Sequence, residues 1–251
     1  MNPAAKKDLD RQDPGTLTRD RAGMFNFLAA LYNQRPDEDF VKNLKGFSAD
    51  QFRHVFGEEG VSEPVTEGLR AVSRYIASIQ DRPVQDIEEE LAVDWTRLFR
   101  GVQPDYGPTP PYESVYLASG KEDQHQMTLI LSELMSIYRQ ERVVLDQVNA
   151  NRPDYLGLEF GFLGFLSEKE TRARLQGDDQ AADEYARKAE KFLRDHPGRW
   201  AAEFCKEAER YAETDFYRGV IEITRGVVSE FSTPGFEEDL NQSTVVEVFD
   251  E

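Results

Sequence analysis

One stretch, residues 156–166, constrains the fold of this chain more than any other. It is apolar on nearly every side when it is wound as an α-helix, and it carries Gly157, Gly161 and Gly164 at helical spacing. A helix without a polar face is usually buried on all sides, so other elements have to surround it. The glycines form a stripe along which a second backbone can approach closely. The sequence therefore predicts a central helix with another element packed closely against it.

The rest of the chain predicts further helices and almost no strand. Apolar residues recur every three or four positions, and several of these segments begin with Ser, Thr or Pro, as helices commonly do. The only run with a strand-like pattern is 243–249, in an acidic stretch. We therefore predict an all-α fold, a single globular bundle of about ten helices. The other helical segments are near residues 16–32, 36–46, 48–56, 62–79, 83–99, 127–138, 178–193, 197–211 and 214–231.

Two irregular segments interrupt the predicted helices. Residues 101–112 are rich in Gly and Pro and cannot form regular structure. Residues 149–154 are polar and contain a proline, and we predict that they form a hinge near the middle of the chain that also caps the next helix. We expect residues 1–15 to be flexible, residues 16–233 to form one all-helical domain, and residues 234–251 to be an acidic tail.

The charge of the chain limits its partners. Its 251 residues include 48 Asp and Glu against 30 Lys and Arg, a formal net charge of −18. This argues against binding to nucleic acid and to anionic lipid, and favours a cationic partner or an uncharged one. The single cysteine, Cys205, excludes an internal disulfide and suits a reducing compartment. Because no stretch resembles a secretory signal or a membrane span, we expect a cytoplasmic protein without stable membrane insertion.

The motifs of common enzyme chemistry are absent from the sequence. It has no glycine-rich phosphate loop, no dinucleotide fingerprint and no serine nucleophile elbow. Its three histidines are far apart, and it contains one Glu-x-x-His where a di-iron bundle needs two. We therefore expect a protein that is not an enzyme, has no metal site and no cofactor, and binds a partner.

The first candidate binding segment flanks the Gly/Pro-rich break. Trp95, Leu98 and Phe99 precede the break and Tyr112 follows it. They would form a groove wall for an apolar peptide segment, or they would pack under a helix as part of a rigid proline loop. The acidic residues before Trp95 would pair with arginines of a ligand, or they would form a solvated helix face. These acids are Asp86, Glu88, Glu89, Glu90 and Asp94.

The second candidate segment lies at the predicted hinge. Pro153 suits the first turn of a helix, and Asp154 can accept hydrogen bonds from the free N–H groups at a helix start. On one interpretation Asp154 is only a cap. On the other it also faces the groove and pairs with a basic ligand.

Together these segments resemble the TorD/DmsD family of molybdoenzyme chaperones, which includes NarJ-type members. The resemblance rests on the runs 94–99, 110–116 and 153–160, and on a C-terminal run that includes His196 and Trp200. It implies an all-helical cytoplasmic chaperone without catalytic activity. Such a chaperone binds the twin-arginine signal peptide and the apo form of a molybdopterin-containing oxidoreductase, assists cofactor insertion and delays export.

The resemblance also implies a set of site residues. In the family the hinge signature is usually Glu-x-Pro-x-Asp-His, whereas here the proline and the acid are adjacent, residue 151 is Asn, and Tyr stands where His is usual. That tyrosine can donate a hydrogen bond but does not titrate near neutral pH. The candidate signal-peptide-binding residues are Trp95, Leu98, Phe99, Tyr112, Glu113, Pro153, Asp154 and Tyr155.

The implied partner is the apo catalytic subunit of a molybdoenzyme, and the family allows either a monomer or a domain-swapped dimer. One alternative is a structural or assembly subunit that remains in a mature redox enzyme complex, which would co-purify with the cofactor-loaded enzyme. Another is an enzyme such as a nucleotide hydrolase, which no phosphate-binding motif in this sequence supports.

Overall fold

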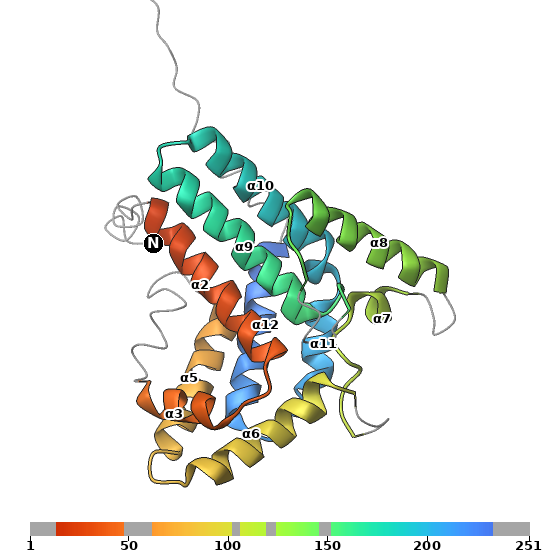
Figure 1. The fold of residues 1–251 in the computed structure, drawn as a ribbon. Helices are drawn as coiled ribbons and strands as arrows, with labels where there is room; N and C mark the ends of the chain where they lie inside the picture. Colours follow the sequence, from red (N-terminus) through yellow and green to blue (C-terminus); the bar gives the residue numbers. More distant parts are fainter. Residues whose placement is uncertain (1–13, 48–61, 102–105, 119–123, 146–151, 233–251) are drawn as a thin grey trace, which may run out of the picture.

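The computed structural model describes residues 14–47, 62–101, 106–118, 124–145 and 152–232. Within these ranges it contains ten α-helices, one 3-10 helix and no strand, which confirms the predicted all-α globule (Figure 1). None of the described helices is both long enough and apolar enough to cross a bilayer. The elements are α2 (Pro14–Asn33), α3 (Glu38–Gly46), α5 (Glu63–Ser78), α6 (Val84–Phe99), α7 (Glu113–Leu117), α8 (Gln124–Gln140), α9 (Leu156–Leu175), α10 (Asp179–Asp195), η2 (Pro197–Arg199), α11 (Ala201–Ala208) and α12 (Asp215–Ser232).

Local capping signals in the sequence explain where two of the helices begin. Asp37 caps α3, because its carboxylate accepts a hydrogen bond from the N–H of Phe40 at 2.8 Å. Asp178 caps α10 in the same way through the N–H of Ala181. The short helix α7 was not predicted, since it directly follows the proline-rich break. The predicted helix at 48–56, the strand-like run 243–249 and all of the predicted acidic tail lie outside the described residues. So does most of the predicted flexible N-terminus, of which Pro14 and Gly15 are described and belong to α2.

Helix α9 is the buried central helix that the sequence predicts. It lies between α2 and α10 (Figure 1). The glycine stripe faces α2: a Cβ atom added at Gly157 would lie 2.6 Å from Oδ1 of Asn33, and one at Gly164 would overlap the side chain of Asn26. A larger residue at Gly157 would also meet Cβ of Tyr32 at 2.8 Å and would force the two helices apart, whereas at Gly164 the side chain of Asn26 would have to turn away.

A second close crossing joins α5 to α12. A Cβ atom at Gly68 would lie 2.5 Å from the carbonyl oxygen of Gly219, and one at Gly219 would lie 2.6 Å from the carbonyl oxygen of Gly68. The two backbones are therefore in direct contact. Helix α12 also reaches α2, because the hydroxyl of Tyr32 donates to Oγ1 of Thr224 at 3.0 Å in the core.

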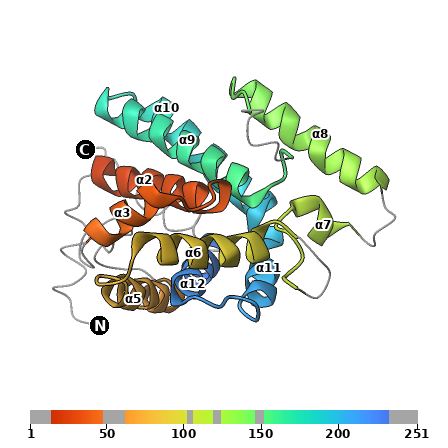
Figure 2. The same ribbon diagram turned by 60° about the horizontal axis from the view of Figure 1, so that its bottom comes forward.

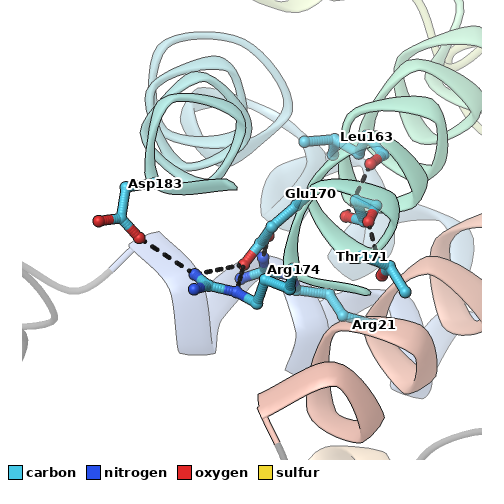
Figure 3. A network of polar contacts seen from close by, with 7 residues as sticks. Arg21, Leu163, Glu170, Thr171, Arg174 and Asp183 are labelled. Atoms are coloured by element: carbon cyan, nitrogen blue, oxygen red, sulfur yellow. Dashed lines mark hydrogen bonds and ion pairs between the residues drawn. The ribbon is translucent and has the colours of Figure 1, made fainter. Parts of the chain in front are cut away.

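A polar network holds α2, α9 and α10 together at one end of the bundle (Figure 3). Its centre is the buried carboxylate of Glu170 on α9, which pairs with the guanidinium groups of Arg21 and Arg174. Arg174 also reaches Asp183 on α10 at 3.3 Å. Because two guanidinium groups surround it, the buried charge of Glu170 is compensated within the protein.

Helix α8 lies at the edge of the molecule (Figure 2). Its buried residues are Ile130, Leu134 and Tyr138, whereas Leu129 is 56% exposed. The ring of Tyr138 packs against Phe162 of α9 at a centroid distance of 4.9 Å. The same ring packs against Phe192 of α10, and α8 also lies against α7.

Candidate functional site

The three candidate residues on α6 lie in the aromatic core. Leu98 and Phe99 are fully buried and Trp95 is 4% exposed. The indole N–H of Trp95 donates to the carbonyl oxygen of Leu31 at 3.0 Å, and the ring of Phe99 lies 4.6 Å from that of Tyr32. These side chains therefore fix α6 against α2, and their contact with a peptide stays a prediction.

The acid that directly precedes Trp95 is also internal. The fully buried carboxylate of Asp94 accepts hydrogen bonds from the N–H groups of Glu213 and Thr214 and from the hydroxyl of Thr214, the last two at 2.8 Å. It thereby caps the start of α12 from another helix. Arg97 pairs with Asp94 at 3.6 Å and with Glu213 at 2.6 Å. Of the five acids counted near Trp95, this one serves the fold, while the other four are exposed or half-buried.

The two candidate segments, which are about 40 residues apart, are joined by an isolated antiparallel bridge between Tyr112 and Tyr155. The N–H of Glu113 donates to the carbonyl oxygen of Asp154 at 2.9 Å, and the rings of Tyr112 and Tyr155 lie 5.2 Å apart. The structure thus brings together Tyr112, Glu113, Pro153, Asp154 and Tyr155.

A cation–π contact connects this group to α6. The guanidinium carbon of Arg100 lies 4.4 Å from the ring centre of Trp95 and 5.7 Å from that of Tyr155. Arg100 therefore lies between Trp95 of α6 and Tyr155 of the bridge. Leu98 and Phe99 remain separated from solvent by the core around them.

Tyr155 donates a hydrogen bond, as expected of a phenol at this position. Its hydroxyl reaches the carbonyl oxygen of Tyr32 at 2.7 Å. Burial raises the pKa of Tyr155, so the phenol stays protonated at physiological pH. The carbonyl oxygen of the neighbouring Pro153 accepts from the hydroxyl of Tyr138 at 2.9 Å. The described end of the predicted hinge is thus anchored to both α2 and α8.

Three buried carboxyl groups and one imidazole lie close together next to the bridge, and we call them the buried acid cluster. They belong to Glu113, Asp154, Glu159 and His196. Nδ1 of His196 lies 3.0 Å from Oε2 of Glu113. The carboxyl group of Glu159 lies near that of Glu113 and the indole of Trp200, but among the described residues neither of its oxygens has a partner in hydrogen-bond geometry. Burial raises the pKa of Glu159 well above its usual range, and the nearby charge of Glu113 raises it further. Within the described residues, no three or more His, Cys, Asp or Glu side chains are arranged to hold a metal ion.

Asp154 caps a different helix from the one predicted. The sequence indicated a cap for the helix that follows, which is α9, but α9 begins without a side-chain cap. Oδ2 of Asp154 instead accepts from the N–H of Ser114 at 3.1 Å and from its hydroxyl at 2.6 Å, at the start of α7. The bridge explains the difference, because it places Asp154 beside α7.

A guanidinium group also rests on Asp154. Nη2 of Arg152 lies 3.1 Å from Oδ2 of Asp154 and 3.2 Å from Oγ of Ser114. Its guanidinium carbon lies 4.4 Å from the ring centre of Tyr112. The carboxylate, the hydroxyl and the aromatic face together form a site whose chemistry suits arginine. We call Asp154, Ser114 and Tyr112 the guanidinium site.

Sequence reasoning missed four residues of this region. Arg152 and Ser114 lie next to predicted site residues, but nothing local shows that they meet. His196 is 83 positions from Glu113, so the pairing has no local signal. Glu159 did carry a signal, because it is the only charged residue between 156 and 167 in a helix that is otherwise apolar and small.

Comparisons with known proteins bear on this arrangement. The family model described as nitrate reductase delta subunit matches residues 58–206, more than half of the chain. The matched range includes all eight candidate residues and runs from the start of α5 through most of α11. Among curated proteins, no sequence matches this chain.

Proposed function

The chain belongs to the nitrate reductase delta subunit family, and from that membership we propose that it binds the twin-arginine signal peptide of a molybdoenzyme catalytic subunit in its apo form. The family comprises redox enzyme maturation chaperones of the NarJ/TorD type, whose partner is a subunit like that of nitrate reductase. We propose further that this chain acts in the cytoplasm, without catalysis of its own, and that it assists cofactor insertion and delays export.

The observation that most supports signal-peptide binding is the guanidinium site. Asp154 supplies a buried carboxylate, Ser114 a hydroxyl and Tyr112 a half-buried ring, and these groups already hold a guanidinium group in the folded chain. Arginine pairs with such a set more specifically than lysine, because its planar group donates in two directions and stacks on rings. A twin-arginine sequence is therefore the kind of ligand that this site selects.

The remaining candidate residues have supporting roles in this proposal. Glu113, Pro153 and Tyr155 fix the bridge that creates the site. Trp95, Leu98 and Phe99 hold α6 in place, and they contact the apolar part of the signal peptide only if α6 separates from α2. The net charge of −18 attracts a basic peptide toward the chain.

Binding of a labelled signal peptide to the full chain tests the proposal. Fluorescence anisotropy is measured with a peptide that carries the paired arginines and with the same peptide carrying paired lysines. We expect the arginine peptide to bind at least about 10-fold more tightly, because one lost charge-assisted hydrogen bond is worth about 1.5–3 kcal/mol. Equal affinity for the two peptides, or no binding of either, contradicts signal-peptide recognition at this site.

The alternative of a retained subunit is tested by co-purification. A maturation chaperone associates with the catalytic subunit that still carries its signal peptide and lacks its cofactor. Tagged chain should therefore recover the apo form from cells and leave the mature enzyme behind. Stable recovery with the cofactor-loaded enzyme would favour a structural subunit of the redox complex.

A further inference from the structure

The guanidinium group that occupies the site belongs to the chain itself. Arg152 contacts both polar members of the guanidinium site and the face of Tyr112, and its side chain is 38% exposed. Asp154 and Ser114 beneath it are fully buried. Arg152 therefore lies at the entrance of the site, between the buried carboxylate and solvent.

The contact between Arg152 and Asp154 is incomplete. Only Nη2 of Arg152 donates to the carboxylate, and only Oδ2 of Asp154 accepts from it. Oδ1 of Asp154 is buried and has no hydrogen-bond partner among the residues that the structure describes. Because the two residues are separated by a single position, the short backbone between them restricts how the guanidinium group can approach. An arginine from another chain has no such restriction and can pair with both oxygens in the stronger bidentate geometry.

We propose that Arg152 is an internal occupant of the guanidinium site and that an arginine of the bound partner replaces it. This inference rests on the proposed function, because the twin-arginine signal peptide supplies the replacing group. Removing Arg152 with nothing in its place would leave the buried carboxylate of Asp154 without its cation, which is unfavourable. The replacement is therefore an exchange of one guanidinium group for another, and a ligand without arginine does not open the site.

Competition by Arg152 lowers the measured affinity for a signal peptide. When an internal group fills a site about nine-tenths of the time, the apparent dissociation constant rises about 10-fold. The variant Arg152→Ala should accordingly bind the labelled twin-arginine peptide about 10-fold more tightly than the natural chain. Arg152→Lys keeps a positive charge near Asp154 but lacks the planar group, so it should bind with intermediate affinity and also serves if the alanine variant folds poorly.

The matched control is Arg218→Ala on α12. Arg218 forms an exposed ion pair with Asp215 at 3.0 Å, so this variant loses the same charge and an ion pair that does not involve the guanidinium site. Its affinity for the peptide should equal that of the natural chain. Unchanged or weaker binding by both Arg152 variants, while the natural chain still binds the peptide, overturns the exchange and leaves the proposed function standing.

A second measurement tests the site without any signal peptide. N-acetylarginine amide should raise the thermal midpoint of Arg152→Ala by several degrees at millimolar concentration, and N-acetyllysine amide should not. The natural chain and Arg218→Ala should respond to neither compound. If Arg152→Ala does not distinguish the two amides, the guanidinium site is wrong. If it distinguishes them and yet no form of the chain binds a signal peptide, the proposed function fails, and with it the exchange.

Discussion

At the scale of single residues, the buried acid cluster is the part of the molecule where charge and burial conflict most. Glu159 is fully buried, and among the described residues neither of its oxygens has a partner in hydrogen-bond geometry. Burial raises its pKa most, and Glu113 and Asp154 raise it further, against a smaller lowering by the indole of Trp200. The neutral acid is therefore the form that the fold prefers. Arg21 and Arg174 compensate Glu170 of the same helix, whereas within the described ranges Glu159 forms no ion pair.

The pKa shift of Glu159 predicts how stability depends on pH. The pKa is higher in the folded chain than in the unfolded chain, so bound protons favour folding. The stabilisation is fully present below the unfolded value of about 4.3 and is lost as the pH rises through the folded value. Glu159→Gln keeps the shape without the charge and should be more stable than the natural chain at pH 8 by about 1–3 kcal/mol.

Urea unfolding at pH 5 and pH 8 measures this effect. The difference between the variant and the natural chain should be smaller at pH 5 than at pH 8. Glu168→Gln is a suitable control, because Glu168 lies on the same helix in an exposed contact with Asn26. If the difference in stability between Glu159→Gln and the natural chain is the same at pH 5 and pH 8, Glu159 keeps its ordinary pKa in the folded chain.

At the scale of elements, carboxylates on one helix complete the ends of others. Asp94 of α6 caps α12, and Asp154 caps α7 from the segment that precedes α9. In both cases the cap and the capped helix are far apart in the sequence. These contacts fix the relative positions of helices as well as stabilising their ends.

Asp94→Ala should lower the free energy of unfolding by about 2 kcal/mol, near the upper end for a helix cap. The variant removes an acceptor for two N–H groups and one hydroxyl, and it leaves Arg97 without a buried partner. Chemical denaturation followed by circular dichroism measures the change. The exposed Asp86→Ala on the same helix should change stability by less than about 0.5 kcal/mol. Equal effects of the two variants would contradict the capping role.

The contact between α5 and α12 predicts a second loss of stability. Gly219→Ala places a methyl group 2.6 Å from a backbone oxygen of α5, which cannot move away as a side chain can. We expect destabilisation by about 1–3 kcal/mol. Gly23→Ala on α2 has nothing within 4 Å of the new atom, so it should stabilise by about 0.5–1 kcal/mol. Thermal unfolding of both variants should therefore show shifts of opposite sign.

The sequence predicts which segments are helical better than it predicts what they contact. Helix α9 was identifiable because its apolar residues surround it, and its glycines predicted the close approach that α2 makes. Gly68 gave no such signal, since it is the single glycine of α5. Gly219 and Gly226 lie seven positions apart on one face of α12 and both pack against α5, a spacing that the sequence reasoning did not use. Asp154 was recognised as a cap, but local rules assign a cap to the next helix, and the bridge to Tyr112 overrides them.

At the scale of the whole molecule, the net charge of −18 governs how a basic ligand arrives. Long-range attraction accelerates association and is screened by salt, whereas contacts in the guanidinium site act mainly after arrival. The association rate of the twin-arginine peptide should fall by about 10-fold or more between 20 mM and 500 mM salt. Stopped-flow fluorescence measures it. If added salt raises the dissociation rate by a larger factor than it lowers the association rate, the screened attraction acts mainly within the bound site instead.

The crossing of α5 and α12 also has a consequence for how the chain is made. Helix α5 is synthesised early, but α12, which it packs against, is among the last of the described residues to be translated. The hydrogen bond from Tyr32 to Thr224 likewise forms only after α12 has been translated. Contacts between such distant parts form late. A ribosome that stops before α12 therefore releases a chain in which α5 lacks the helix that it packs against, so a functional receptor exists only after α12 has been made.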